Sequence, residues 1–165
     1  MIKPADHTIA LQQDAVQAAL AAHAHRPGAM LPILHDIQQR LGHVPSDAVP
    51  VIAQRLNLSR AEVHGVVTFY HDFRAHAPGA HVVKLCRAEA CQSVGGAALE
   101  AHACRSLGVE WHGTTTDGAV TLEPVYCLGN CALGPSALVD GEPVGRLNAE
   151  TFDAMIAELR QGAAR

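Results

Sequence analysis

Four cysteines, arranged as two close pairs, constrain this chain more than any other feature of its sequence. Cys86 and Cys91 have four residues between them, and Cys127 and Cys131 have three. Thiolates are soft ligands, so four of them brought to one place would bind a soft, positively charged group. The pairs leave three interpretations open: an iron–sulfur cluster, a structural zinc ion, or thiols with no shared ligand.

The segments before the two pairs predict how the pairs meet. Residues 81–85 and 119–126 are typical of β-strands, and each leads into one pair. If these strands are neighbours in one sheet, both pairs lie in loops at the carboxyl ends of strands. Open α/β sheets commonly bind their ligands at that edge.

The spacing favours the cluster without excluding the other two interpretations. Zinc-binding pairs usually have a spacing near Cys-x2-Cys. A cluster also needs four thiolates but tolerates wider loops, because it is larger than a single ion. Glycines flank both pairs and would let backbone N–H groups approach the sulfurs, although ordinary turn chemistry explains them equally well: Gly95, Gly96, Gly129 and Gly134. The bond before Pro135 is expected to be trans by default, with cis as the alternative.

The fifth cysteine, Cys104, is expected to stay outside the site. It falls in a helix predicted for residues 92–107, where a buried thiol packs like a small hydrophobic side chain. That helix places four apolar residues on the same face as this thiol: Val94, Ala97, Ala101 and Leu107. Five cysteines is an odd number, and a disulfide framework would leave one over. Reduced thiols in a cytoplasmic chain are therefore expected.

Composition excludes several classes of function. Hydrophobic residues make up 48% of the 165 residues and charged residues 17%, which indicates a globular chain. The formal net charge is −4 and the only lysines are Lys3 and Lys84, so no basic patch for nucleic acid is expected. No apolar run approaches the ~18 residues of a transmembrane helix. The N-terminus lacks the apolar segment of a secretory signal peptide.

The hydrophobic period changes near Gly79 and predicts two domains, an α+β organisation. Residues 1–78 predict a helical bundle that follows a loose tail at residues 1–8. Its helices are expected at residues 9–25 and 29–41, then after a Ser46 cap, and then after a capping box at Ser59–Glu62. Gly42 is the expected left-handed C-cap of the second helix.

Residues 79–165 predict a small sheet covered by helices. Beyond the strands and helix already named, residues 136–139 and 143–146 flank Asp140-Gly141, a strong hairpin signal. Asn148 is expected to cap a final helix. This order of elements is compatible with a thioredoxin-like α/β domain.

Several side chains near the predicted helices and cysteines have two interpretations each. Phe69 is expected in the core, whereas Tyr70 and Phe73 are left open between core and partner surface. Arg87, inside the first cysteine loop, is expected to be a solvated surface arginine, with a cation beside the site as the alternative. The eleven histidines show no ligand spacing.

Long stretches of the chain resemble a known family. PGAMLPILHDIQQRLGHVP, LNLSRAEVHGVVTFYHDFR, CRAEAC and CLGNCALGP are similar to the thioredoxin-like [2Fe–2S] subunit of NAD-linked oxidoreductases, over about residues 27–160. That family includes the small subunit beside the flavin subunit of respiratory complex I, the gamma subunit of soluble NAD-dependent formate dehydrogenase and the diaphorase part of NAD-reducing hydrogenases. The resemblance implies one [2Fe–2S] cluster, the only metal centre, held by Cys86, Cys91, Cys127 and Cys131.

The resemblance also implies a non-catalytic electron-transfer subunit of a larger complex. FMN and NAD are then expected on a partner flavoprotein subunit and not on this chain. Within the family, CRAEACQSVGG resembles the formate dehydrogenase gamma subunit, because complex I forms tend to carry Gly-Thr at the positions of Ala88 and Glu89 and often His at Gln92. A soluble molybdenum formate dehydrogenase is the expected parent, with complex I or a hydrogenase as alternatives. A zinc-stabilised interaction module is the alternative of another class.

Overall fold

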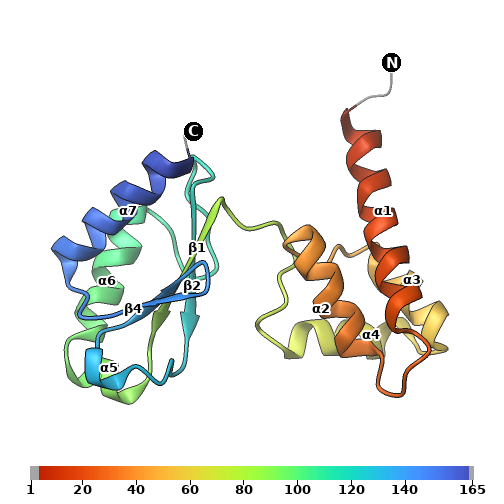
Figure 1. Cartoon of the computed structure of the whole chain (residues 1–165), viewed down its shortest axis with the longest axis horizontal. Coiled ribbons are helices and arrows are strands. Elements are labelled where there is room, and N and C mark those ends of the chain that lie inside the picture. The colour runs from red at the N-terminus through yellow and green to blue at the C-terminus, as the bar shows by residue number, and fades with distance from the viewer. Residues whose placement is uncertain (1–3, 164–165) are drawn as a thin grey trace. The chain divides into compact units, whose positions relative to one another are not determined.

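The computed structural model describes residues 4–163, and the chain divides into two compact units, Met1–Ala77 and Pro78–Arg165 (Figure 1). The first unit is entirely helical between its loops, and the second combines helices with a four-stranded sheet. This confirms the predicted α+β class. Each unit has its own hydrophobic core and is described by itself.

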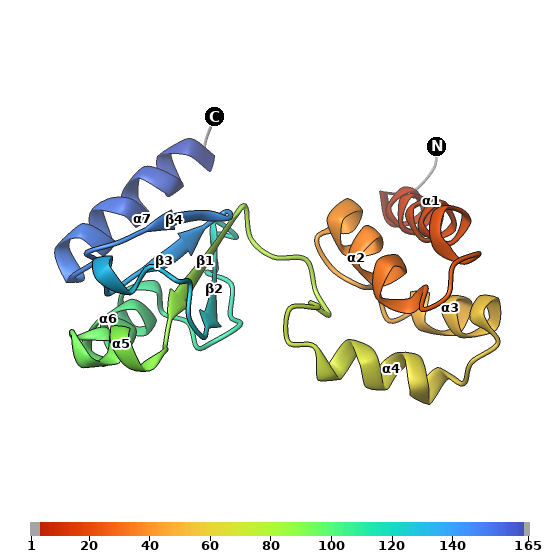
Figure 2. The ribbon, with the colours of Figure 1, turned by 60° about the horizontal axis from the view of Figure 1, so that its bottom comes forward.

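Four helices build the first unit: α1 (Pro4–His23), α2 (Met30–Leu41), α3 (Ala48–Leu56) and α4 (Arg60–Phe69) (Figure 2). Their apolar faces meet in one core with the segment that follows α4: Val16, Leu20, Ile33, Leu34, Ile37, Ile52, Val63 and Phe73. Gly42 ends α2 at φ +77°, and Ser59 and Glu62 form the capping box of α4. Both caps confirm the sequence prediction.

Two predictions for the helix N-termini of this unit are wrong. Helix α1 begins at Pro4, so residues 4–8 belong to a helix and not to a loose tail, of which residues 1–3 lie outside the described part. Proline suits the first turn of a helix, because its missing N–H would have no partner there anyway. Ser46 does not cap α3 with its side chain. The carbonyls of Pro45 and Ser46 accept the first N–H groups of that helix instead.

The second unit is built on one sheet with strand order β2-β1-β3-β4. Its strands are β1 (His81–Cys86), β2 (Val120–Val125), β3 (Ala137–Val139) and β4 (Glu142–Val144). Strands β1 and β2 are parallel, whereas β3 pairs antiparallel with both β1 and β4. Asp140 (φ +51°) and Gly141 (φ +95°) form the predicted hairpin turn between β3 and β4.

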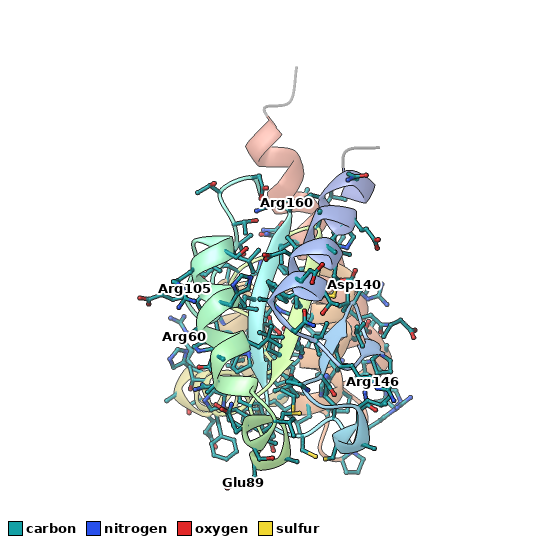
Figure 3. The ribbon with its side chains drawn as sticks, turned by 90° about the vertical axis from the view of Figure 1, so that its left-hand side faces the viewer. Arg60, Glu89, Arg105, Asp140, Arg146 and Arg160 are labelled. Atoms are coloured by element: carbon teal, nitrogen blue, oxygen red, sulfur yellow. The ribbon has the colours of Figure 1, made fainter. Side chains whose placement is uncertain are left out.

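Helices α6 (Gly96–Leu107) and α7 (Ala149–Ala163) lie side by side over one face of this sheet (Figure 3). Alternate residues of the strands point toward them and form the core together with residues of the two helices: Val83, Leu85, Val120 and Leu122 from the strands, and Leu99, Ala103, Leu107, Phe152 and Ile156 from α6 and α7. Asp153 joins the two helices by accepting hydrogen bonds at 2.9 Å from His102 and Ser106. Asn148 caps α7 as predicted, because its Oδ1 accepts the N–H of Thr151.

The helix predicted for residues 92–107 is in fact two helices. Helix α5 (Glu89–Ser93) is separated from α6 by Gly95, whose φ of +102° breaks the helical path. The predicted buried face is therefore wrong except at Leu107. Val94 precedes α6 and is 54% exposed. The residues of α6 that enter the core are shifted around the helix: Gly96, Leu99, Ala103 and Leu107.

Within residues 4–163, none of the helices combines the length and the apolar character needed to cross a membrane.

Candidate functional site

Both cysteine pairs lie at one edge of the sheet. Strands β1 and β2 run in the same direction, and Cys86, the last residue of β1, pairs in register with Val125, the last residue of β2. Cys127 follows two residues later. The N–H of Arg87 donates to the Val125 carbonyl at 2.8 Å, which holds the two loops together where they leave the strands. The expected strand arrangement is thus observed, and Figure 1 shows both strands pointing to the end where α5 lies.

The two cysteines of the first pair are buried. Cys86 is 7% exposed and Cys91, in α5, is 2% exposed. Gly96 is required beside Cys91, because a Cβ at that position would lie 2.6 Å from the Cys91 carbonyl oxygen. Figure 3 labels Glu89, the first residue of α5, at this end of the unit, and Arg160 of α7 near the opposite end.

The second cysteine loop is exposed and has an unusual backbone. Cys127 (φ +83°) and Gly129 (φ +73°) both adopt left-handed conformations, and Cys131 begins a short 3₁₀ turn. Both cysteines are exposed. The peptide bond between Gly134 and Pro135 is cis, so the default expectation of a trans bond is wrong and the alternative holds.

Hydrogen bonds from both loops favour a thiolate at Cys86. Burial alone would raise the pKa of this thiol, but the N–H groups of Ala88, Cys127 and Leu128 donate to its sulfur. Together with the Cys91 side chain they lower the Cys86 pKa below its usual value. An N–H donor to a ligand sulfur stabilises the charged form. The backbone is therefore arranged for a negatively charged sulfur before any ligand is considered.

The other sulfurs show how close the pairs are. Burial and the neighbouring Cys86 raise the pKa of Cys91. Repulsion from Cys127, together with a hydrogen bond to it, raises the pKa of Cys131, and Cys86 adds to that repulsion. Each pair is thus in internal contact, and the charge of Cys86 also acts on the second pair. A positively charged group between them would relieve this repulsion, because opposite charge favours thiolates.

Ser136 supports the site, and no sequence pattern pointed to it. Its side chain is 1% exposed, and its hydroxyl lies 3.2 Å from the Leu133 carbonyl oxygen and 3.3 Å from that of Asn130, both in the second loop. Its N–H and hydroxyl also act on the Cys91 sulfur, where they oppose the rise in pKa. Its carbonyl accepts the N–H of Cys86 at 2.9 Å. One buried residue therefore joins both cysteine loops.

Arg87 is not the solvated surface residue that the sequence predicted. Its Nε lies 2.9 Å from Glu100 Oε2, and its guanidinium carbon lies 4.9 Å from the centre of the Trp111 ring. The hydroxyl of Tyr126 lies 3.4 Å from its Nη1. A guanidinium is planar and can stack on an aromatic ring while it binds a carboxylate, which explains this position.

The remaining sequence candidates lie outside the site. Cys104 is half-buried and packs against the edge of the second core, where burial raises its pKa. Phe73 is 8% exposed, but Phe69 is 72% exposed, so the expectation of a buried Phe69 is wrong. Phe69 lies six residues after Val63, the buried residue of α4, and this spacing places the two side chains on different sides of the helix. A hollow of about 840 Å³ belongs to the first unit and is lined by no cysteine.

The four thiols could hold a two-iron group. Among the described residues 4–163, no three His, Cys, Asp or Glu side chains gather closely enough around one point to hold a single metal ion. The thiols form two pairs instead, and a [2Fe–2S] cluster takes two thiolates on each iron. Backbone N–H groups aimed at Cys86 are also the kind of donor that such sulfurs accept.

A model of the thioredoxin-like [2Fe-2S] ferredoxin family matches residues 16–160. The chain belongs to this family. Its members carry one [2Fe–2S] cluster, and the resemblance drawn from the cysteine motifs is confirmed. The match spans residues of both units, so the helical unit is part of the family's pattern as well.

Relatives of the chain within this thioredoxin-like ferredoxin family include subunits of NADH-quinone oxidoreductases. A subunit of NADH-quinone oxidoreductase from Rhizobium meliloti is 34% identical over 148 residues, which cover 90% of this chain and 88% of that protein. A subunit of NADH-quinone oxidoreductase from Escherichia coli K12 is 29% identical over 151 residues, covering 92% of this chain and 91% of that protein.

A solved structure resembles the ferredoxin chain in three dimensions. The NAD⁺-reducing [NiFe]-hydrogenase in its H₂-reduced state aligns with a TM-score of 0.66 and 25% identity, over 80% of this chain and 22% of the hydrogenase chain. The ferredoxin chain therefore spans about a fifth of that much longer polypeptide.

Proposed function

We propose that this chain is a non-catalytic electron-transfer subunit in which Cys86, Cys91, Cys127 and Cys131 hold one [2Fe–2S] cluster. The observation that carries the proposal is the meeting of both cysteine pairs at one sheet edge, with N–H groups of both loops donating to Cys86. The bound cluster supplies one-electron chemistry. The four cysteine sulfurs would coordinate it, and backbone N–H groups of the chain would offset the negative charge of these sulfurs.

The partner in this proposal is a flavoprotein subunit that binds FMN and NAD. A flavin exchanges hydride with a nicotinamide and single electrons with a cluster, so the two-electron chemistry belongs to the partner. The names of the relatives support this role, since NADH-quinone oxidoreductases and an NAD⁺-reducing hydrogenase both couple NAD to an electron chain. A cytoplasmic location follows from the same proposal.

For the parent complex we place the chain in a molybdenum NAD-dependent formate dehydrogenase, with an NADH-quinone oxidoreductase or an NAD-reducing hydrogenase as the alternatives. Glu89 and Gln92 support the choice, because they stand where complex I forms tend to carry Thr and His. Formate would be oxidised at a molybdenum centre in another subunit, and this chain would exchange electrons with the flavin.

Cysteine replacement tests the ligand set. The chain, purified anaerobically from iron-replete cells, is expected to be brown, to contain two iron and two sulfide per chain and to give a [2Fe–2S] EPR signal after reduction. Cys127→Ser is expected to lose or distort the cluster, and the matched control Cys104→Ser to keep it. Zinc without iron, or equal loss in both variants, would overturn the proposal.

Co-expression tests the partner and the parent complex. The chain, expressed with the products of adjacent reading frames, is expected to co-purify with a flavoprotein and to show no NADH oxidation alone. The assembled complex should reduce NAD⁺ with formate. Reduction with hydrogen, or quinone reduction by NADH, would assign the chain to one of the alternatives, and NADH oxidation by the pure chain would refute the subunit role.

A further inference from the structure

We propose that Arg87 and Glu100 form a charge-balanced pair that sets the reduction potential of the cluster. The inference rests on the proposed function, because it needs the cluster at the four cysteines. It assigns a role to side chains around Arg87 that are not themselves ligands of the cluster. We call Arg87, Glu100, Trp111 and Tyr126 the arginine clamp.

The clamp is attached to both cysteine loops. Arg87 directly follows Cys86, and Tyr126 directly precedes Cys127, so each is a chain neighbour of one cysteine from a different pair. The Tyr126 hydroxyl lies 3.4 Å from Arg87 Nη1. The N–H of Arg87 is also bound, at 2.8 Å, to Val125 next to Tyr126. The clamp is therefore attached to the backbone of both cysteine loops, next to one cysteine of each pair.

Besides Tyr126, two partners contact the guanidinium. Glu100 approaches from α6 and accepts from Nε at 2.9 Å. Trp111, in the loop after α6, places its ring 4.9 Å from the guanidinium carbon. The side chains of Arg87 and Glu100 are 33% and 21% exposed, so water reaches the pair but does not surround it. A hollow of about 420 Å³ lies beside them, lined by Gln92, Ala97, Cys104 and Tyr126 among others.

The pair's effect on the cluster follows from charge alone. Reduction makes the cluster one unit more negative, so a nearby positive charge favours the reduced form and a nearby negative charge opposes it. With both partners present, the opposite charges of Arg87 and Glu100 partly cancel at the cluster. Removal of either partner leaves the other uncompensated, and the two removals must shift the potential in opposite directions.

If the Arg87–Glu100 salt bridge only held the cysteine loops in place, the expected result would differ. Loss of either partner would then loosen the same salt bridge, so both variants would disturb the cluster alike. Removal of both partners would be no better than removal of one. The sign of the shift therefore separates charge balance from simple support.

The test uses the full chain with its cluster loaded, in an EPR-monitored redox titration. Glu100→Gln is expected to raise the ratio of reduced to oxidised cluster about tenfold at a fixed ambient potential, a shift of about 59 mV for a one-electron couple. Arg87→Gln is expected to lower that ratio by a similar factor. The double variant should return to within about twofold of the wild type, because neither charge then remains.

Arg105→Gln is the matched control, since this arginine is exposed on the same helix, α6, as Glu100. It removes one charge without touching the clamp, and its ratio is expected to stay within about twofold of the wild type. Shifts of the same sign in both clamp variants, or shifts no larger than that of the control, would overturn the inference. Absence of iron from the wild-type chain would instead refute the proposed function, and iron content measured on each sample distinguishes the two failures.

Discussion

A Cβ on Gly145 would lie 2.6 Å from the Cβ of Leu133. Gly145 directly follows β4, and Leu133 ends the short turn that begins at Cys131. The N–H of Arg146 donates to the Leu133 carbonyl at 2.6 Å, so the chain after the hairpin lies directly against the second cysteine loop. The lack of a side chain at Gly145 thus allows the second cysteine loop to pack directly against the chain after β4.

Replacement of this glycine is expected to disturb the exposed cysteine pair. In Gly145→Ala the new methyl group also meets the Leu133 carbonyl oxygen at 2.7 Å, so backbone must move. Overpacking of this kind costs about 1–3 kcal/mol. The variant is expected to bind less iron per chain and to unfold at lower urea concentration. Gly162→Ala in α7, where a Cβ would meet nothing within 4 Å, is the control and should behave as the wild type.

Loss of the Ser136 hydroxyl is expected to weaken the link between the loops. Ser136→Ala removes the hydroxyl donor that the Asn130 and Leu133 carbonyls share, while each carbonyl keeps a backbone N–H donor, so a loss of about 1 kcal/mol is expected. The Cys91 sulfur loses a donor as well, so the reduction potential of the cluster should fall. Urea unfolding and redox titration check the two effects. Ser93→Ala, whose exposed hydroxyl bonds only the nearby Ala90 carbonyl, should change neither quantity.

Two phenylalanines of the first unit should differ sharply in their effect on stability. Phe73→Ala removes a ring that is 8% exposed and packs 5.0 Å from the His35 ring, so a loss of about 3 kcal/mol is expected. Phe69→Ala removes a ring that is 72% exposed, and its effect should stay within about 0.5 kcal/mol. Urea unfolding of the full chain, followed by far-UV circular dichroism, measures both. Equal losses would contradict the assignment of Phe73 to the core.

Asp36 is expected to make the first unit sensitive to acid. The Arg40 side chain donates to this carboxylate and, with His23 at 3.1 Å, holds the Asp36 pKa below its usual value. Because the folded-state pKa is the lower one, the contribution is complete above the unfolded-state value of about 3.9 and is lost as the pH falls below it.

Asp36→Asn is therefore expected to lower the unfolding free energy by about 1 kcal/mol at pH 7, the usual net value of such hydrogen bonds. The gap between wild type and variant should close below about pH 4. Urea midpoints at pH 7, 5, 4 and 3 measure this. A gap that widened in acid would show that the carboxyl is stabilised in its protonated form.

Local sequence signals predicted the elements that local chemistry decides. Asp140-Gly141 formed the expected hairpin turn, Asn148 and Ser59 capped their helices, and the strands before the cysteine pairs became parallel neighbours. For the hairpin turn and the two caps, a few adjacent residues are enough to determine the local structure. Parallel pairing of β1 with β2 then brought the two cysteine loops to one edge without further information.

Features that depend on tertiary contacts could not be read from the sequence. Gly95 interrupts the expected helix with a φ of +102°, and the next residue, Gly96, lies directly against the Cys91 carbonyl. Arg87 binds Glu100 and stacks on Trp111, and these residues lie 13 and 24 positions away in sequence (100 − 87 and 111 − 87). Ser136 likewise has partners that only the folded loops bring to it.

The unequal exposure of the two cysteine pairs gives the site an inner and an outer side. Cys86 and Cys91 are enclosed by the sheet edge and α5, whereas Cys127 and Cys131 reach solvent. Electron tunnelling slows steeply with distance, so a redox partner works best where protein is thinnest. We therefore expect electrons to reach the proposed cluster on the side of Cys127 and Cys131.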